Sequence, residues 1–457
     1  MRSNWRILAV AMAASWLAPQ LAAGEATEDQ LRALNERMAQ MEQRLTATQE
    51  ELTASQQRVE QQQAVIQELD ADRGAASGLS KFLSETEFSG AVAGSYTYNF
   101  RNFESSAVDF NSSDTIGGEN LGFGGITAPH HSSSNTFQVD QLYIAMRKQP
   151  TPESRAGWGA TIAFGVSADS LTLPDSDDLS GNLTHLYEAY ASYLFDCGEG
   201  VNFTLGRYAT VTGAETFLVD QNLNVTRGLL WALQPVNHTG AYVRGTLGEV
   251  FTWQLGASNS YGNTMADTDS HPTFVGSVGF KQDTMGLKVN GVYGGDVDDL
   301  LFPIGTFTGI PFFDSGVARN GDKVGLLDVV LNWDPSERLA TWLNFDMYKT
   351  DNFFDTNGLT IYGIGGAGRY AITDATGFGL RYEWMLFDDF YGFDATMMEL
   401  TGTLDHRLTD NLVASIEARW DRGDIESFPD IIFLSESGSS FVNDNQVMGV
   451  VQLRYEF

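Results

Sequence analysis

The chain has 457 residues, carries a formal net charge of −32 and contains a single cysteine, Cys197. Because a protein that binds phosphates needs a basic surface, this acidic balance excludes nucleic acid as a partner. One cysteine excludes an intrachain disulfide. Beyond the first residues no stretch approaches the roughly eighteen apolar residues of a spanning helix, so the chain can cross a bilayer only by closing a sheet.

The first residues, 1–23, have the pattern of a secretory signal peptide. Two arginines precede an apolar run over residues 7–18, and small residues follow at 22–24. A charged start, a short apolar run and a small-residue cleavage site are the parts of an export signal. We therefore expect an exported protein and, from the pattern that follows, a location in the bacterial outer membrane.

Residues 27–73 predict a coiled coil, because they contain no proline or glycine and their apolar residues repeat in heptads. The a positions are Leu31, Met38, Leu45, Leu52, Val59 and Ile66, and the d positions are Leu34, Met41, Thr48, Ser55, Gln62 and Leu69. A solvated single helix acting as a spacer is the alternative. An apolar seam needs a partner, so we expect a parallel trimer, with the coil in the periplasm and a linker at 74–84.

From residue 85 to the C-terminus, apolar and polar residues alternate in segments of about ten residues. The chain ends on such a segment, in which Val451, Leu453, Tyr455 and Phe457 share one face and form the expected assembly signal. The segments lie near 88–100, 137–148, 157–167, 184–195, 201–208, 240–247, 251–258, 273–281, 285–294, 324–333, 339–348, 360–371, 377–387, 395–404, 411–421 and 447–457. They predict an all-β fold, a transmembrane antiparallel up-and-down barrel of about sixteen strands over residues 85–457.

The connections between these segments support the same fold. Long connections, such as 101–136 and 209–239, alternate with tight turns, such as 196–200 and 282–284. Long loops on one side and short turns on the other are typical of outer-membrane barrels. Aromatic residues also gather near the two ends of the segments, where the interfacial belts of a membrane protein would lie.

Charged residues occupy the face of the strands that we expect to point inward, and a barrel of about sixteen strands encloses an aqueous lumen. The candidate pore-lining residues are Arg244, Lys288, Arg369, Arg381, Arg419, Arg454, Glu188, Asp328, Asp346, Glu383, Glu399 and Glu417. Two interpretations remain open, and both can hold. The charges form ion pairs that stiffen the wall, or they form opposed walls that orient a polar solute at a narrow point.

The connection 209–239 is the candidate constriction loop. It is more apolar than the other long loops, and an apolar loop exposed to water would be unusual. Its candidate functional residues are Asp220, Asn222, Asn224, Arg227 and His238. The sequence leaves two placements open, in the lumen or at a contact between subunits.

No enzymatic motif is present. The sequence has six histidines and contains neither a Gly-x-Ser-x-Gly nor a His-Glu-x-x-His pattern. The adjacent histidines at 130 and 131 point in different directions, and the aspartate clusters of the loops lack the spacing of a calcium loop. We therefore expect no catalytic residues, no metal site and no cofactor.

Several segments resemble one known family. The stretches 88–100, 137–143, 186–194, 205–208 and 224–240 are similar to the outer-membrane β-barrel porin family called porin-2 or OmpL-like. The likeness is clear over roughly 85–300 and continues mainly as a pattern beyond it. The resemblance implies a porin, and the N-terminal coil resembles the periplasmic coils of some trimeric solute porins.

We therefore expect an outer-membrane porin, a trimer in contact with membrane lipid, that lets small hydrophilic solutes or ions diffuse passively through a water-filled barrel. The alternative is a structural protein whose coil spaces the layers of the envelope and whose barrel is mainly an anchor. Ion preference stays open, because an acidic mouth favours cations whereas lumenal arginines favour anions.

Overall fold

A computed structural model describes most of the barrel and a few N-terminal residues. The described residues are 39, 43–46, 48–49, 52–53, 55–57, 59, 80–100, 115–116, 119–120, 130–131, 135–171, 185–262, 271–295, 323–350, 358–390, 393–425 and 445–457. The chain divides into two compact units, Met1–Ser84 and Glu85–Phe457. None of the helices among these described residues has the length and apolar character needed to cross a membrane.

The described residues between 39 and 59 are helical, as the heptad pattern predicts for them. Side-chain hydrogen bonds follow the helical spacing, since Thr48 Oγ1 donates to the Arg44 carbonyl at 2.8 Å. The signal peptide and most of the coiled-coil seam lie outside the described residues, so both the coil and its trimeric state stay predictions. Residues 80–84 are also helical, where we expected linker, because the glycine-rich composition of the linker ends at Gly78.

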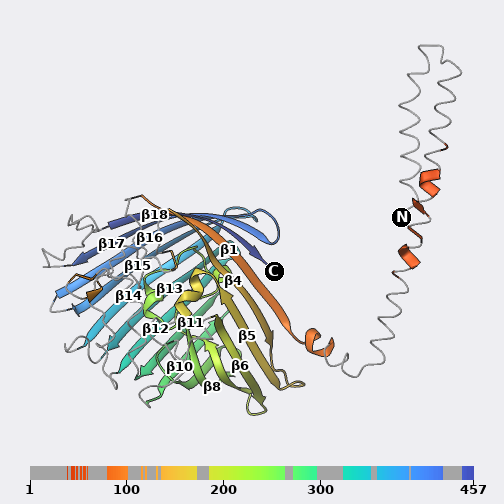
Figure 1. The fold of residues 1–457 in the computed structure, drawn as a ribbon. Coiled ribbons are helices and arrows are strands. Elements are labelled where there is room, and N and C mark those ends of the chain that lie inside the picture. Colours follow the sequence, from red (N-terminus) through yellow and green to blue (C-terminus); the bar gives the residue numbers. More distant parts are fainter. Residues whose placement is uncertain are drawn as a thin grey trace. The chain divides into compact units, whose positions relative to one another are not determined.

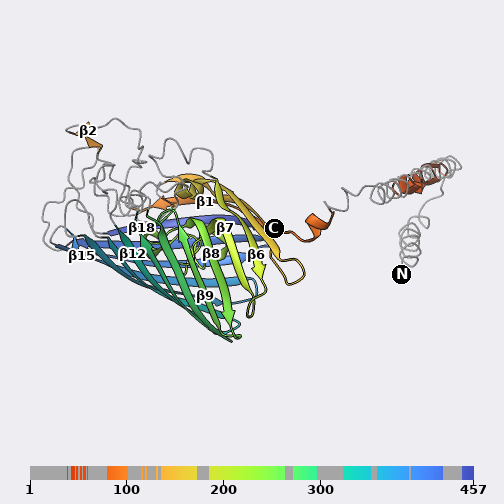
Figure 2. The same cartoon turned by 90° about the horizontal axis from the view of Figure 1, so that it is seen from below.

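The second unit is a closed antiparallel barrel of sixteen strands, which confirms the predicted fold (Figure 1). In chain order its strands are β1 (Glu87–Asn99), β4 (Thr136–Lys148), β5 (Ala156–Phe164), β6 (Leu186–Phe195), β7 (Val201–Ala209), β8 (Asn237–Leu247), β9 (Phe251–Ser258), β10 (Thr273–Gln282), β11 (Met285–Gly294), β12 (Val324–Ser336), β13 (Leu339–Thr350), β14 (Leu359–Ala371), β15 (Thr376–Phe390), β16 (Phe393–Arg407), β17 (Leu412–Ile425) and β18 (Asn445–Glu456). Each strand pairs with its neighbours in the chain, and Figure 2 shows the tilted wall that results.

The two faces of the wall differ as the alternation predicts. On β15 the outward side chains of Phe378 and Tyr382 are exposed. The inward side chains of Arg381 and Glu383, on either side of Tyr382 in the chain, are buried. The same alternation holds along β1 and β18. Large apolar side chains therefore point outward, where lipid would lie, and polar side chains point into the barrel.

Strands β1 and β18 close the barrel, with Val92 opposite Tyr455. The last residue extends this pairing, since Gly90 and Phe457 exchange two backbone hydrogen bonds of 2.9 Å. A Cβ at position 90 would meet the Phe457 ring at 2.5 Å, so this glycine lets the terminal aromatic ring lie across the first strand.

Two details depart from the predicted elements. The third strand ends at Phe164 and is followed by the 3₁₀ helix η1 (Val166–Leu171), because Gly165 adopts a φ of +100° that strand geometry does not allow. The first long connection contains a short hairpin, β2 (Thr115–Ile116) with β3 (Glu119–Asn120).

Candidate functional site

The segment between β7 and β8 leaves the wall and folds into the barrel (Figure 1). It carries two short 3₁₀ helices, η2 (Val219–Gln221) and η3 (Leu230–Leu233). Residues 224–230 and 232–236 are buried although they belong to no strand of the sheet. Of the two placements that the sequence left open, the structure has the lumenal one. We call residues 210–236 the lumenal loop.

Apolar side chains hold the lumenal loop against the wall on several sides. Phe217, Leu218 and Val219 pack on inward residues of β1, β4, β5 and β6. On another part of the wall, η3 packs on inward apolar residues of β10 to β15, which are Val275, Val292, Val324, Leu326, Tyr348, Leu359, Ile361, Met385 and Phe387. Packed side chains therefore occupy the lumen beside these strands, so the lumen at this level is not the open, water-filled barrel that we expected.

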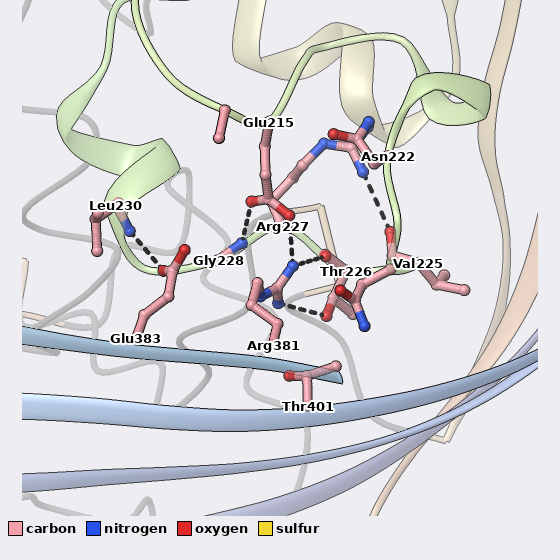
Figure 3. Close-up of polar contacts among 12 residues, drawn as sticks. Glu215, Asn222, Val225, Thr226, Arg227, Gly228, Leu230, Arg381, Glu383 and Thr401 are labelled. Atoms are coloured by element: carbon pink, nitrogen blue, oxygen red, sulfur yellow. Dashed lines mark hydrogen bonds and ion pairs between the residues drawn. The ribbon is translucent and has the colours of Figure 1, made fainter. Parts of the chain in front are cut away.

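Carboxylates of the wall accept hydrogen bonds from the backbone of the loop. Glu417 on β17 accepts from the amides of Val225 and Thr226 at 2.7 and 3.0 Å. Glu383 on β15 accepts from the Leu230 amide at 2.9 Å (Figure 3). A buried backbone amide without a partner is costly, so these carboxylates satisfy donors that no sheet or helix could satisfy.

A buried network of charged side chains lies between the lumenal loop and strands β15 to β17. The guanidinium of Arg381 bonds to Glu215 of the loop and to the Thr226 carbonyl (Figure 3). It also bonds to Glu399 of β16. Arg419 of β17 lies 3.1 Å from the same Glu399. Both arginines are at most 1% exposed, so their charges need these partners to offset the loss of water.

Arg227 of the loop adds another buried cation. Its guanidinium donates to the carbonyls of Thr216, Val225 and Phe217 at 2.8, 3.2 and 3.1 Å. Burial lowers the pKa of Arg227 to about 10, although nearby Glu215 opposes that shift. The side chain therefore stays protonated at neutral pH and ties together the two halves of the loop.

Two inward carboxylates, Asp328 on β12 and Asp346 on β13, face each other across the register and are fully buried. Their partners are amides. Asp328 accepts from the Gly213 amide at 3.1 Å, and Asp346 accepts from Gln234 Nε2 at 2.7 Å. Asn344 donates to both carboxylates, at 2.6 and 3.2 Å. This cluster fixes the two ends of the loop to β12 and β13.

The predicted pore-lining residues all lie on the inward face, but they fall into two groups. One group is buried by the lumenal loop or by neighbouring side chains, which we did not expect, and it comprises Glu188, Asp328, Asp346, Arg381, Glu383, Glu399, Glu417 and Arg419. The other group keeps contact with water and comprises Arg244, Lys288, Arg369 and Arg454. Position in the strand therefore gave the face of each residue, but not its access to water.

The predicted loop residues serve mainly to shape the loop. Asn222 donates to the carbonyls of Thr216 and Leu218 at 3.0 and 2.7 Å, and Asn224 donates to Thr403 of the wall at 2.7 Å. Asp220 is only partly buried. His238 belongs to β8 and not to the loop. Its Nε2 lies 3.3 Å from Thr210 Oγ1.

The sequence interpretation missed the partners that complete these contacts. Glu215, Gln234 and Asn344 each bond between loop and wall, and so does Gln141, whose Oε1 accepts from the Val219 amide at 3.0 Å. Asn344 and Gln141 stand at inward positions of their strands, which is the one signal in the sequence that pointed to them.

On the turn side of the lumenal loop the barrel holds a cavity of about 150 Å³ with a mixed polar and apolar lining. The cavity is lined by Ala214, Gln221, Asn222 and Leu223 of the loop and by Asn332, Asp334, Ala340, Thr341 and Trp342 of β12 and β13. Inward residues of this half of the barrel, such as Arg244 and Lys288, are exposed. The turn-side half of the lumen is therefore open to water.

The chain is similar to several known proteins in fold and to one family in sequence. A search of curated proteins found no match. Among solved structures, the high-pH form of OprB from Pseudomonas putida is 11% identical with a TM-score of 0.50, covering 84% of this chain and 96% of that one. An anion-selective porin from Comamonas acidovorans is 10% identical with a TM-score of 0.49, covering 81% and 99%. At 11% identity, the likeness to OprB shows the fold alone.

The family model described as putative beta-barrel porin-2, OmpL-like, matches residues 85–457. That span is the whole of the closed barrel and includes every strand, the lumenal loop and the C-terminal phenylalanine. The chain therefore belongs to this family of outer-membrane β-barrel porins.

Proposed function

We propose that the protein is an outer-membrane porin through which small hydrophilic solutes or ions diffuse passively, and that the lumenal loop narrows the passage. The observation that carries this proposal is the closed barrel of sixteen strands with apolar side chains outside and polar side chains inside. The family match supports the same role, and both point to a channel without catalytic activity.

The proposed passage is narrow. The loop packs on β1, β4–β6 and β10–β15, so only small solutes can share the cross-section with it. The cavity beside Asn222 and Asn332 lies next to the loop, and we assign the solute path to that side.

The proposed assembly is a trimer, in which the coils of the three chains pack together in the periplasm. The apolar a positions support this, since Leu45, Leu52 and Val59 are exposed in a single chain at 69%, 56% and 48%. A seam of exposed leucine and valine is stable only when another helix covers it.

One observation favours the rival role, in which the barrel is mainly an anchor. The packed side chains around η3 resemble a protein core more than the wall of a wide pore. A plugged barrel would anchor a periplasmic coil that spaces the envelope layers, without conducting.

Single-channel recording in planar bilayers separates the two roles. We expect the purified full-length protein, its folding checked by heat-modified gel mobility, to produce discrete conductance steps. The steps should be smaller than those of an unobstructed barrel with as many strands, because the loop occupies the lumen. Folded protein that inserts but never conducts would favour the anchor.

A further inference from the structure

The inward charges divide the barrel wall into two regions, which the sequence alone did not show. From β14 round to β6, each exposed or partly exposed inward arginine has an acidic partner. Arg369 pairs with Asp405 at 2.6 Å, and Arg454 pairs with Glu456 at 2.8 Å. Arg147 likewise pairs with Glu188, and Arg407 lies 3.9 Å from Glu456. Arg454 and Arg407 share Glu456, so these four arginines and their three acidic partners add one net positive charge to this part of the wall.

The adjoining wall, β8 to β11, differs. Arg244 on β8, Lys281 on β10 and Lys288 on β11 all stand at inward positions and are exposed. Within the part of the chain that the structure describes, none of the three makes an ion pair. We call these three residues the cationic strip.

Strand register places Lys281 and Lys288 close together and Arg244 three strands away from Lys288, about 14 Å across the wall. Lys281 pairs with Gly286, so Lys288 is its diagonal neighbour, about 7–8 Å away. Arg244 stands opposite Gln254, in the next row toward the loop. Between the cations the inward positions of β9 and β10 carry uncharged residues, namely Thr252, Gln254, Ser277 and Gly279. No carboxylate interrupts the strip on these strands.

Inward carboxylates do not cancel the strip. Asp328, Asp346, Glu383, Glu399 and Glu417 are at most 1% exposed and are bound by amides or arginines. The exposed acids nearby are Asp334, which lines the cavity, and Glu199, which bonds to Thr246. Glu249 and Asp283 are also exposed, and they lie in the turns that join β8 to β9 and β10 to β11. The inward strand positions of β8 to β11 are thus cationic, although acids lie in their turns and the whole chain carries −32.

From this geometry we propose that the cationic strip is an anion subsite of the turn-side lumen, so that the porin prefers small hydrophilic anions over cations. The inference rests on the proposed function, because a subsite can select ions only in a conducting channel. The cavity beside Asn222, Asn332 and Trp342 opens on the same half of the lumen and offers amide groups and an aromatic side chain to the uncharged part of such a solute.

Reversal potentials under a potassium chloride gradient test the proposal on the full-length protein. We expect the native channel to prefer chloride. Replacing Arg244→Gln and Lys288→Gln should lower the chloride preference by about twofold per charge, the factor for a unit charge roughly 10 Å from an ion in water. The charge-reversing pair Arg244→Glu and Lys288→Glu should invert the preference.

A matched control removes a neutral pair from the opposite wall. Arg369→Gln with Asp405→Asn deletes one cation and one anion together, so we expect no change in reversal potential. A native channel that prefers potassium, or an unchanged potential in the Arg244→Gln/Lys288→Gln variant, would overturn the anion subsite and leave the porin intact. Folded protein that never conducts would overturn the porin and the subsite together.

Discussion

Shortening the lumenal loop is expected to raise the single-channel conductance several-fold. Thr210 and Val236 are already joined by a backbone hydrogen bond of 3.3 Å, so a short Gly-Ser turn can replace residues 211–235 without moving β7 or β8. The replacement removes η2 and η3 and the side chains that pack on inward residues of β1, β4–β6 and β10–β15. Single-channel recording measures the gain, and uptake of a larger sugar into proteoliposomes measures the wider passage.

The control for this variant is a turn that lies outside the lumen. Replacing residues 149–155, between β4 and β5, with a similar Gly-Ser turn should leave the conductance unchanged. If the shortened loop conducts no better than this control, the loop does not narrow the passage, and the account of the lumen given above is wrong.

The second large effect is expected from Arg381. Replacing it with alanine leaves Glu215 and Glu399 buried without their shared cation and leaves the Thr226 carbonyl without that donor. Breaking a buried ion pair by removing one partner costs about 3–5 kcal/mol. We expect the loop to detach from β15 and β16, which would be measured as faster hydrogen exchange of the Val225, Thr226 and Leu230 amides.

The matched control is Arg369→Ala on the neighbouring strand β14. Its pair with Asp405 is partly exposed, so its loss should cost at most about 1 kcal/mol and leave the exchange of the loop unchanged. Equal protection of the loop amides in both variants would show that Arg381 does not hold the loop. Urea unfolding of the two variants gives an independent comparison of their stability.

The fold was predictable because the alternation of side chains between the two faces of a strand depends only on neighbouring residues. A period of two fixes which face each residue occupies, and every strand of the barrel was found within a few residues of its place. Where the prediction failed at Val166, the cause is one positive φ at Gly165. Glycine adopts positive and negative φ about equally readily, so the sequence does not show which one it takes.

The site was predictable only in part, because access to water depends on contacts between distant segments. Arg381 and Arg244 have the same inward phase and the same type of charge, yet Arg381 is buried beneath the loop and Arg244 faces water. The partner that decides the difference is Glu215, 166 residues from Arg381 along the chain. The alternation within a strand carries no information on a contact between residues so far apart in the chain.

The apolar character of the loop was the informative signal, but it left two placements possible. Leu229 and Leu230 would be equally well buried in the lumen or against another subunit. The lumenal placement follows from the complementary residues of the wall, since inward apolar positions on β10 to β15 match η3. Inward apolar residues in a barrel with a polar lumen could have suggested a folded insert.

One crosslink tests the central claim, that residues 210–236 lie inside the barrel. A Cβ built at Gly363 of β14 lies 3.1 Å from Leu230 Cγ of η3, which brings the two positions within reach of a disulfide. In a Cys197→Ser background, Leu230→Cys and Gly363→Cys should form this bond in the folded protein, detected by mass spectrometry of the joined peptides. Failure to crosslink, together with rapid labelling of the cysteine at 230 by a bulky maleimide, would contradict the account.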